Sequence, residues 1–277
     1  MKVKSENISL EDASKVYLLP CLFTASNLFF GFLSIIRSMQ ARYCSVSEAM
    51  STTYYTQAVW FVFLSGICDL LDGRIARLGG KESLFGKEFD SIADVVSFGV
   101  APALMVFLMI LSPTEQFPFF RQVGWIFGSL YLLCASVRLA RFNVITHPLL
   151  PKAEQEKNNY DFLGLPVPAA AGVIVSIVLI LNEYDLRGWS LMLPPLMLLI
   201  AWLMVSNIYY PSFKKVDWST QTKWGTFLVS MTVLSLVALL RDVALAAIFL
   251  GYVFWGIFRH VARKKHILKA VKAKWRR

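Results

Sequence analysis

Eight long apolar segments constrain the fold of this chain more than any other feature of its sequence. A helix that spans a bilayer needs about 20 apolar residues, and segments of that kind recur along the whole chain. They lie near residues 18–40, 55–76, 90–111, 123–141, 166–182, 189–206, 224–240 and 243–260. Only 17% of the residues are charged, against about 25% in soluble domains. The sequence therefore predicts an all-α polytopic membrane protein with about eight transmembrane helices.

The distribution of basic residues predicts how these helices are oriented. If the amino terminus faces the cytoplasm, only five of the 28 Lys and Arg residues fall on the opposite side. These five are Arg37, Arg42, Arg121, Arg187 and Arg241. Cytoplasmic loops carry an excess of Lys and Arg. We therefore expect both termini in the cytoplasm, and the protein in the cytoplasmic (inner) membrane.

The two ends of the chain are expected to lie outside the spans. Residues 1–17 contain no apolar core followed by a cleavage site, so no cleaved signal peptide is expected. They are expected to form an interfacial segment, as a short amphipathic helix or as disordered chain. Residues 261–277 form a basic tail that supplies most of the net charge of +10. Nucleic acid is one partner for such a tail, but directly after a span the favoured partners are anionic membrane lipids.

One stretch of 27 residues, CDLLDGRIARLGGKESLFGKEFDSIAD, carries four aspartates within the membrane-like chain. Asp69 and Asp72 are three residues apart and Asp90 and Asp94 are four apart, so each pair shares one face of a helix. Both pairs lie where a predicted span meets the cytoplasm, and the short connection predicts antiparallel neighbouring helices. The four carboxylates can therefore converge, which requires counter-charge. Mg²⁺ and Mn²⁺ prefer carboxylate oxygens, and nearby Lys and Arg side chains are the alternative.

Small residues complete a longer pattern around these acids, D-x2-D-G-x2-A-R-x8-G-x3-D-x3-D. The chain matches it at every fixed position: Asp69, Asp72, Gly73, Ala76, Arg77, Gly86, Asp90 and Asp94. This pattern resembles the signature of the CDP-alcohol phosphatidyltransferases, integral membrane enzymes that make phospholipid headgroups. The stretches LPCLFTASNLFFGFLSI, VRLARFN and FLGLPVPAAAG are similar to those of the branch of this family that uses serine as the acceptor.

The resemblance implies an architecture and a reaction. The architecture is a six-helix catalytic core over residues 18–206, followed by two additional helices within 207–260, and a homodimer. The reaction is transfer of a phosphatidyl group from CDP-diacylglycerol to the hydroxyl of L-serine, with release of CMP. Other acceptors, such as glycerol 3-phosphate or inositol phosphate, use the same signature residues. A transporter with intramembrane carboxylates is an alternative of a different class, but it would place acids near the bilayer midplane.

The resemblance also implies roles for individual residues. Asp69, Asp72 and Asp90 would hold two divalent ions, Mg²⁺ or Mn²⁺, while Asp94 would share one of them and act as the catalytic base. The residues that would bind CDP-diacylglycerol are Gly73, Arg77, Ser83, Thr24 and Asn27. Singly, these residues also fit simpler roles: a glycine in helix packing, and an Arg at a span end that extends to the interface.

The carboxylate of serine requires a cation in its pocket, and the residues near the end of the fourth predicted span supply two. Arg138 and Arg141 are three residues apart on one helical face, and Asn143 follows them. Arginine is suited to bidentate recognition of a carboxylate. We expect these three residues to bind serine; the alternative is that the arginines only fix the orientation of the span.

Overall fold

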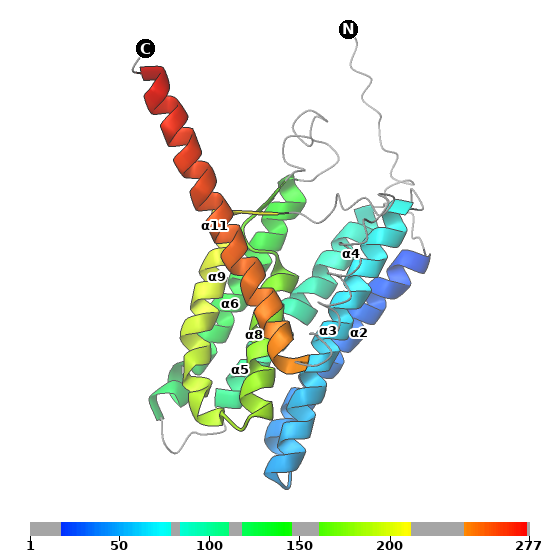
Figure 1. Cartoon of the computed structure of the whole chain (residues 1–277). Coiled ribbons are helices and arrows are strands. Elements are labelled where there is room, and N and C mark those ends of the chain that lie inside the picture. The colour runs from blue at the N-terminus through cyan, green and yellow to red at the C-terminus, as the bar shows by residue number, and fades with distance from the viewer. Residues whose placement is uncertain (1–17, 79–83, 111–117, 146–160, 212–240, 276–277) are drawn as a thin grey trace, which may run out of the picture.

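Helices account for nearly all of the structure. A computed structural model describes residues 18–78, 84–110, 118–145, 161–211 and 241–275. Its helices in chain order are α2 (Leu18–Tyr43), α3 (Glu48–Leu78), α4 (Leu84–Asp94), the π-helix η1 (Val95–Val100), α5 (Ala101–Ile110), α6 (Pro118–Ile145), α8 (Val167–Glu183), the 3-10 helix η2 (Arg187–Met192), α9 (Leu193–Val205) and α11 (Arg241–Trp275) (Figure 1). The predicted all-α fold class is confirmed.

Within the part of the chain that the structure describes, five helical stretches are long and apolar enough to cross a membrane. They are Leu18–Tyr43, Leu84–Ile110, Gln122–Ile145, Gly188–Val205 and Val243–Ala262. Helix α3 has 31 residues and carries acidic side chains near its end, and α8 is a shorter apolar helix. Seven of the predicted segments thus coincide with helices, whereas residues 224–240 lie outside the described part of the chain. The protein is a polytopic integral membrane protein, and the total of eight spans stays a prediction.

Helix α8 occupies the centre of the bundle because it is apolar on every side. A helix that is hydrophobic all round has to be buried, and 12 of its 17 residues are. It contacts α3, α9 and α11, while α2 packs along α3 and α6 along α9. Its first turn contains Pro168, a position where the missing N–H of proline costs no helical hydrogen bond.

The predicted span at 90–111 corresponds to one continuous helical stretch, Leu84–Ile110, with a π-helical turn in its middle. Helix α4 passes into η1 directly after Asp94, and η1 passes into α5. Within α5, Pro102 has no N–H to offer the preceding turn. The fully buried Tyr131 of α6 donates its hydroxyl to the carbonyl oxygen of Phe98 at 3.1 Å. This bond joins α6 to the π-helical turn just beyond the aspartates.

Two short strands, absent from the sequence prediction, join the segments that follow α6 and α9. Strands β1 (Asp161–Leu163) and β2 (Tyr209–Pro211) pair antiparallel, with Phe162 opposite Tyr210. Directly after β1 the chain turns at Gly164, whose φ of 80° lies in the left-handed region that glycine adopts without strain. A Cβ at this position would also collide with the carbonyl oxygen of Met204. Only glycine fits here.

Helix α11 crosses the bundle and extends beyond it at the end where α3 finishes (Figure 1). Its Phe249 stacks on Phe63 of α3, with ring centroids 6.0 Å apart, and lies against Gly172 of α8. The division of the chain into a core at 18–206 and additional helices at 207–260 stays a prediction, although α11 packs on the same bundle.

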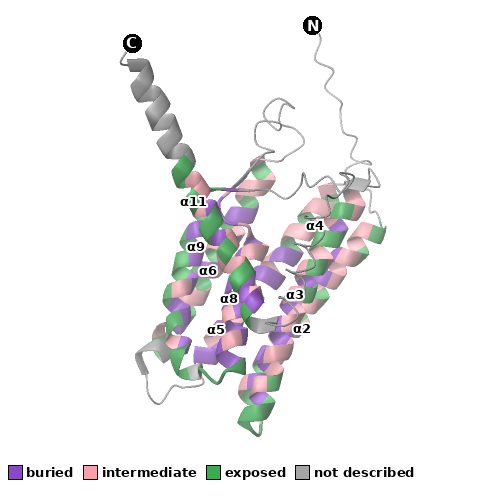
Figure 2. Cartoon of the chain, viewed as in Figure 1, coloured by how far each residue is buried: buried purple, intermediate pink, exposed green. Residues whose placement is uncertain are grey.

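Figure 2 shows buried residues at the centre and exposed ones on the outer faces. Large apolar side chains such as Phe32, Trp202 and Phe254 are exposed there, as expected of a surface that faces lipid.

Candidate active site

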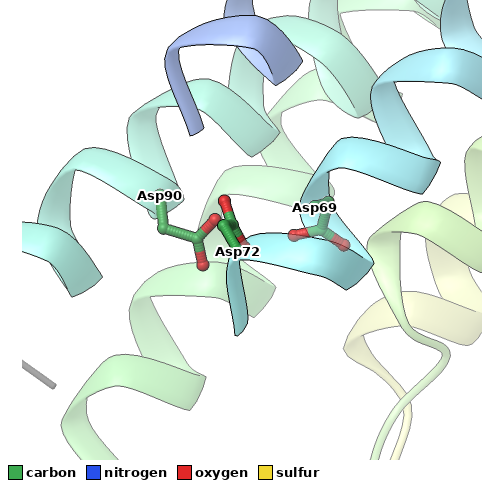
Figure 3. A group of neighbouring side chains, drawn as sticks. All are labelled: Asp69, Asp72 and Asp90. Carbon is green, nitrogen blue, oxygen red and sulfur yellow. The ribbon is translucent and has the colours of Figure 1, made fainter. Parts of the chain in front are cut away.

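Three carboxylates from two helices converge at one end of the bundle. Asp69 and Asp72 come from α3 and Asp90 from α4, and one oxygen of each lies within 4.8 Å of the others. Figure 3 shows the Asp90 side chain directed from its helix toward Asp72 on the facing one. The spacing of three residues places both α3 carboxylates on one face, as predicted. The predicted convergence is thus confirmed for these three of the four aspartates.

The arrangement of the helices around this group differs from the expected one. Among the described residues, α3 and α4 share no extended contact, and α2 packs against both of them. We expected α3 and α4 to be direct antiparallel neighbours. The carboxylates of the two helices lie close to one another, and α2, which packs against both helices, connects them. This arrangement leaves the acids facing a common centre.

Helix α2 reaches the acids through two polar side chains that the sequence analysis singled out. Thr24 is buried and donates its hydroxyl to Asp72 Oδ2 at 2.7 Å. Asn27 is completely buried and donates from Nδ2 to Asp94 Oδ1 at 3.2 Å. Both residues therefore lie in the site. Each of them thus bonds one of the four aspartates directly.

The fourth aspartate is placed differently from the other three. Asp94 is only 7% exposed, and it is not part of the group whose oxygens lie within 4.8 Å of one another. Its carboxyl is close enough to Asp69 for a side-chain hydrogen bond, and Asn27 holds its other side. The site thus consists of a group of three acids and one adjacent acid that has its own support.

The group of three acids can hold a metal ion. Two like charges about 4 Å apart repel each other by about 4 kcal/mol at an effective dielectric constant of 20, so a cation between three ionised carboxylates would relieve a large repulsion. Asp90 Oδ1 is buried and has no hydrogen-bond partner among the described residues. Buried polar atoms normally have partners, and a cation would supply one. Carboxylate oxygens are the ligands that Mg²⁺ and Mn²⁺ prefer.

The three residues expected to bind serine are separated by the structure. Arg138 of α6 is only 7% exposed and interacts electrostatically with Asp94 and Asp69. Arg141 instead donates to Asn207 Oδ1 at 3.1 Å in an exposed bond. Asn143 donates to Ser91 Oγ at 2.9 Å. Of the three, Arg138 is the one brought to the aspartates.

The remaining predicted donor-binding residues are placed only in part. Gly73 follows Asp72 on α3 and is half-buried. Arg77 lies in the last turn of α3, and its side chain is outside the described part of the structure. Ser83 also lies outside the described residues.

Three further residues at the site were missed by the sequence analysis. Ser65 and Ser97 both donate to Asn27. Tyr252 of α11 lies near enough to Arg138 to interact with it electrostatically. Ser65 precedes Asp69 by four residues and Ser97 follows Asp94 by three, so the helical spacing of the aspartates, continued by one turn, could have found both. No pattern in the sequence pointed to Tyr252.

Comparison with known families identifies the family of this chain. The profile of the CDP-alcohol phosphatidyltransferase family matches residues 17–206, a range that contains all four aspartates and Arg138. The chain belongs to this family. The resemblance drawn from the signature is therefore confirmed over more than two thirds of the sequence.

Several relatives of the chain have names that refer to serine as a substrate or to a serine lipid as a product. A protein of Helicobacter pylori is 38% identical over 89% of this chain and 92% of its own length, and is named CDP-diacylglycerol–serine O-phosphatidyltransferase. A protein of Saccharomyces cerevisiae with the same name is 38% identical over 56% of this chain and 51% of its own length. An archaetidylserine synthase of Methanothermobacter thermautotrophicus is 32% identical over 73% of each chain.

Proposed function

We propose that this phosphatidyltransferase uses L-serine as its acceptor and CDP-diacylglycerol as its donor, giving phosphatidylserine and CMP. The relative from Helicobacter pylori, which aligns with most of the chain, supports both substrates by its name. The structural observation that carries the proposal is the buried guanidinium of Arg138 beside the aspartates. A planar guanidinium matches the carboxylate of an amino acid in a bidentate arrangement. Serine bound in this way would place its hydroxyl near the acids.

The reaction joins one oxygen–phosphorus bond and breaks another. The hydroxyl oxygen of serine attacks the phosphorus that carries the diacylglycerol oxygen, and the bond from that phosphorus to CMP breaks. The hydroxyl proton goes to the carboxylate of Asp94. Asn27 donates to one oxygen of this carboxylate and so keeps it in place. Catalysis of this kind depends mainly on positioning and on neutralising charge.

Asp69, Asp72 and Asp90 hold divalent metal in this proposal, as two ions of Mg²⁺ or Mn²⁺, with Asp94 sharing one of them. Metal held there would supply positive charge that offsets the negative charge of the diphosphate during the reaction. Thr24 keeps the Asp72 carboxylate in place through its hydrogen bond. Gly73, Arg77 and Ser83 bind the CDP part of the donor together with Thr24 and Asn27.

An acceptor panel tests the proposal. Purified protein in detergent or nanodiscs is given CDP-diacylglycerol with serine, serinol, glycerol 3-phosphate or inositol phosphate, and the release of CMP is measured. We expect CMP release with serine in the presence of Mg²⁺ or Mn²⁺, and none after chelation by EDTA. A larger rate with glycerol 3-phosphate or inositol phosphate would move the protein to another branch of its family. Serine-dependent turnover in EDTA would refute the role of the metal.

The proposal also places the active site at the cytoplasmic face of the cytoplasmic membrane. Cys44, at the exposed turn between α2 and α3, should react with an impermeant maleimide in intact cells. A cysteine placed at Val261, which is 45% exposed, should react only after permeabilisation when Cys44 is replaced by Ser. The opposite labelling pattern would reverse the orientation. The predicted homodimer is tested by mass measurement of the purified protein in nanodiscs.

A further inference from the structure

Three polar side chains from three helical segments meet at Asn27, which is completely buried. Its side-chain oxygen Oδ1 accepts a short hydrogen bond from the hydroxyl of Ser65 on α3. Its backbone carbonyl oxygen lies 3.0 Å from the hydroxyl of Ser65 and 3.0 Å from that of Ser97 on η1. Its Nδ2 donates to Asp94. Every polar group of the Asn27 side chain thus has a partner.

The number of hydroxyl protons determines whether Ser65 or Ser97 donates to each of the two oxygens of Asn27. A serine hydroxyl has one proton to donate. Ser97 reaches only the backbone oxygen of Asn27 among the bonds that the structure gives it. The proton of Ser65 is therefore available for Asn27 Oδ1. An amide whose oxygen is held in this way has to present its N–H₂ group on the other side, where Asp94 lies.

We propose that Ser65 is a positioning residue that fixes the orientation of the Asn27 amide and, through it, the place of the Asp94 carboxylate. The inference rests on the proposed function, in which Asp94 accepts the proton of serine. It assigns to Asn27 a role toward the base, in addition to any contact with the donor. Ser65 and Ser97 lie outside the eight signature positions.

The close approach of the helices supports this assignment. A Cβ on Gly31, one turn beyond Asn27 on α2, would collide with Ser97. The glycine therefore allows η1 to reach the Asn27 carbonyl. The π-helical turn begins at the residue after Asp94, and π-turns within α-helices occur frequently at functional sites. Gly31, Ser97 and Ser65 together hold Asn27 from two sides.

Replacement of Ser65 by Ala removes the donor to Asn27 Oδ1. The amide can then rotate and present its oxygen to the oxygens of Asp94, which repel it. A displacement of about 1 Å in a catalytic group can cost about 100-fold in rate. We expect Ser65→Ala to lower kcat by about 10- to 100-fold. The KM values for serine and CDP-diacylglycerol, and the Mn²⁺ concentration for half-maximal activity, should change little.

A matched control is available on α2. Ser38 is also completely buried, and its hydroxyl donates to the carbonyl of Ser34 within its own helix. Ser38→Ala should keep the kcat of the wild type. Ser97→Ala should give a smaller loss than Ser65→Ala, because the Ser65 proton would then be divided between the two oxygens of Asn27. Ser65→Thr, which keeps the hydroxyl, should restore most of the kcat.

Two outcomes would overturn the inference: a kcat of Ser65→Ala equal to that of Ser38→Ala, or a loss that lies entirely in KM or in metal activation. If the wild type uses an acceptor other than serine, the proposed function fails. The kcat of Ser65→Ala relative to that of the wild type, measured with that acceptor, still tests the inference. A double-mutant cycle on the melting temperature gives a readout independent of activity. Ser65→Ala and Asn27→Ala should be non-additive because they break the same bond; additive shifts would contradict the contact itself.

Discussion

The aspartates of α3 and the arginines of α6 have the same spacing in the sequence, but only the aspartate side chains of a pair lie together in the site. Asp69 and Asp72 are three residues apart, and their carboxylates converge with that of Asp90. Arg138 and Arg141 are also three apart, yet only Arg138 is directed to the acids, while Arg141 bonds Asn207. A short side chain stays on its helical face, whereas a long one can reach partners in several directions. Spacing therefore determines the position of a carboxylate better than that of a guanidinium.

The largest expected effect comes from the aspartate side of this comparison. Asp69→Asn, Asp72→Asn or Asp90→Asn should each abolish turnover, with a loss beyond about 1,000-fold, because each removes a negatively charged ligand. Without metal, the melting temperature should stay equal or rise, since one like-charge repulsion is relieved. Turnover is measured on protein purified in detergent with Mg²⁺ or Mn²⁺ supplied, and the melting temperature on the same protein after chelation by EDTA.

Asp185→Asn is the matched control for these three variants. Asp185 is exposed in the turn after α8, and its φ of 53° is one that Asn tolerates. It should keep full activity. Substantial turnover in any of the three site variants would contradict a shared metal site.

The arginine side of the comparison predicts a smaller and more selective loss. Arg138→Lys keeps the charge but loses the planar fork, and a hydrogen bond to a charged group contributes about 1.5–3 kcal/mol. We expect kcat/KM for serine to fall by roughly 10- to 150-fold, with the KM for CDP-diacylglycerol nearly unchanged. Arg141→Lys, in which an exposed bond to Asn207 is altered, should lose much less.

Serinol, which lacks the carboxylate, separates recognition from general damage to the site. It should be a poor substrate of the wild type, and Arg138→Lys should reduce its use only slightly further. Equal losses for serine and serinol in this variant would mean that Arg138 does not bind the carboxylate. A larger effect of Arg141→Lys than of Arg138→Lys would reverse the distinction between the two arginines.

The part of the site that the sequence predicted is the part made by short side chains at fixed spacing. The apolar segments also predicted seven of the observed helices. The route by which the helices come together could not be predicted, because α2 joins α3 and α4 through bonds of Thr24 and Asn27. The place of Tyr252 next to Arg138 depends on the packing of α11 against the bundle, which leaves no local pattern in the sequence.

The packing of α11 gives the next prediction. A Cβ on Gly256 would collide with the ring of Tyr210, which is fully buried beneath α11, whereas a Cβ on Gly251 meets no atom within 4 Å. Extra atoms in a packed interior typically cost about 1–3 kcal/mol. Gly256→Ala should therefore lower the melting temperature in detergent, and Gly251→Ala should not. Equal melting temperatures for the two variants would mean that α11 is not closely packed here.

The smallest expected effect concerns Asn143. Its variants test whether this residue of α6 has a structural role or binds the acceptor. If Asn143 mainly ties α6 to α4 through its bond to Ser91, then Asn143→Ala and Ser91→Ala should each lower stability by about 0.5–1.5 kcal/mol. The double variant should lose no more than the larger single one, because both remove the same bond. If Asn143 instead contacts serine, Asn143→Ala should raise the KM for serine while Ser91→Ala leaves it unchanged. Melting temperatures and serine titrations of the three variants decide between the two roles. A rise in the serine KM that occurs only in Asn143→Ala would mean that Asn143 contacts serine in the acceptor pocket, together with Arg138.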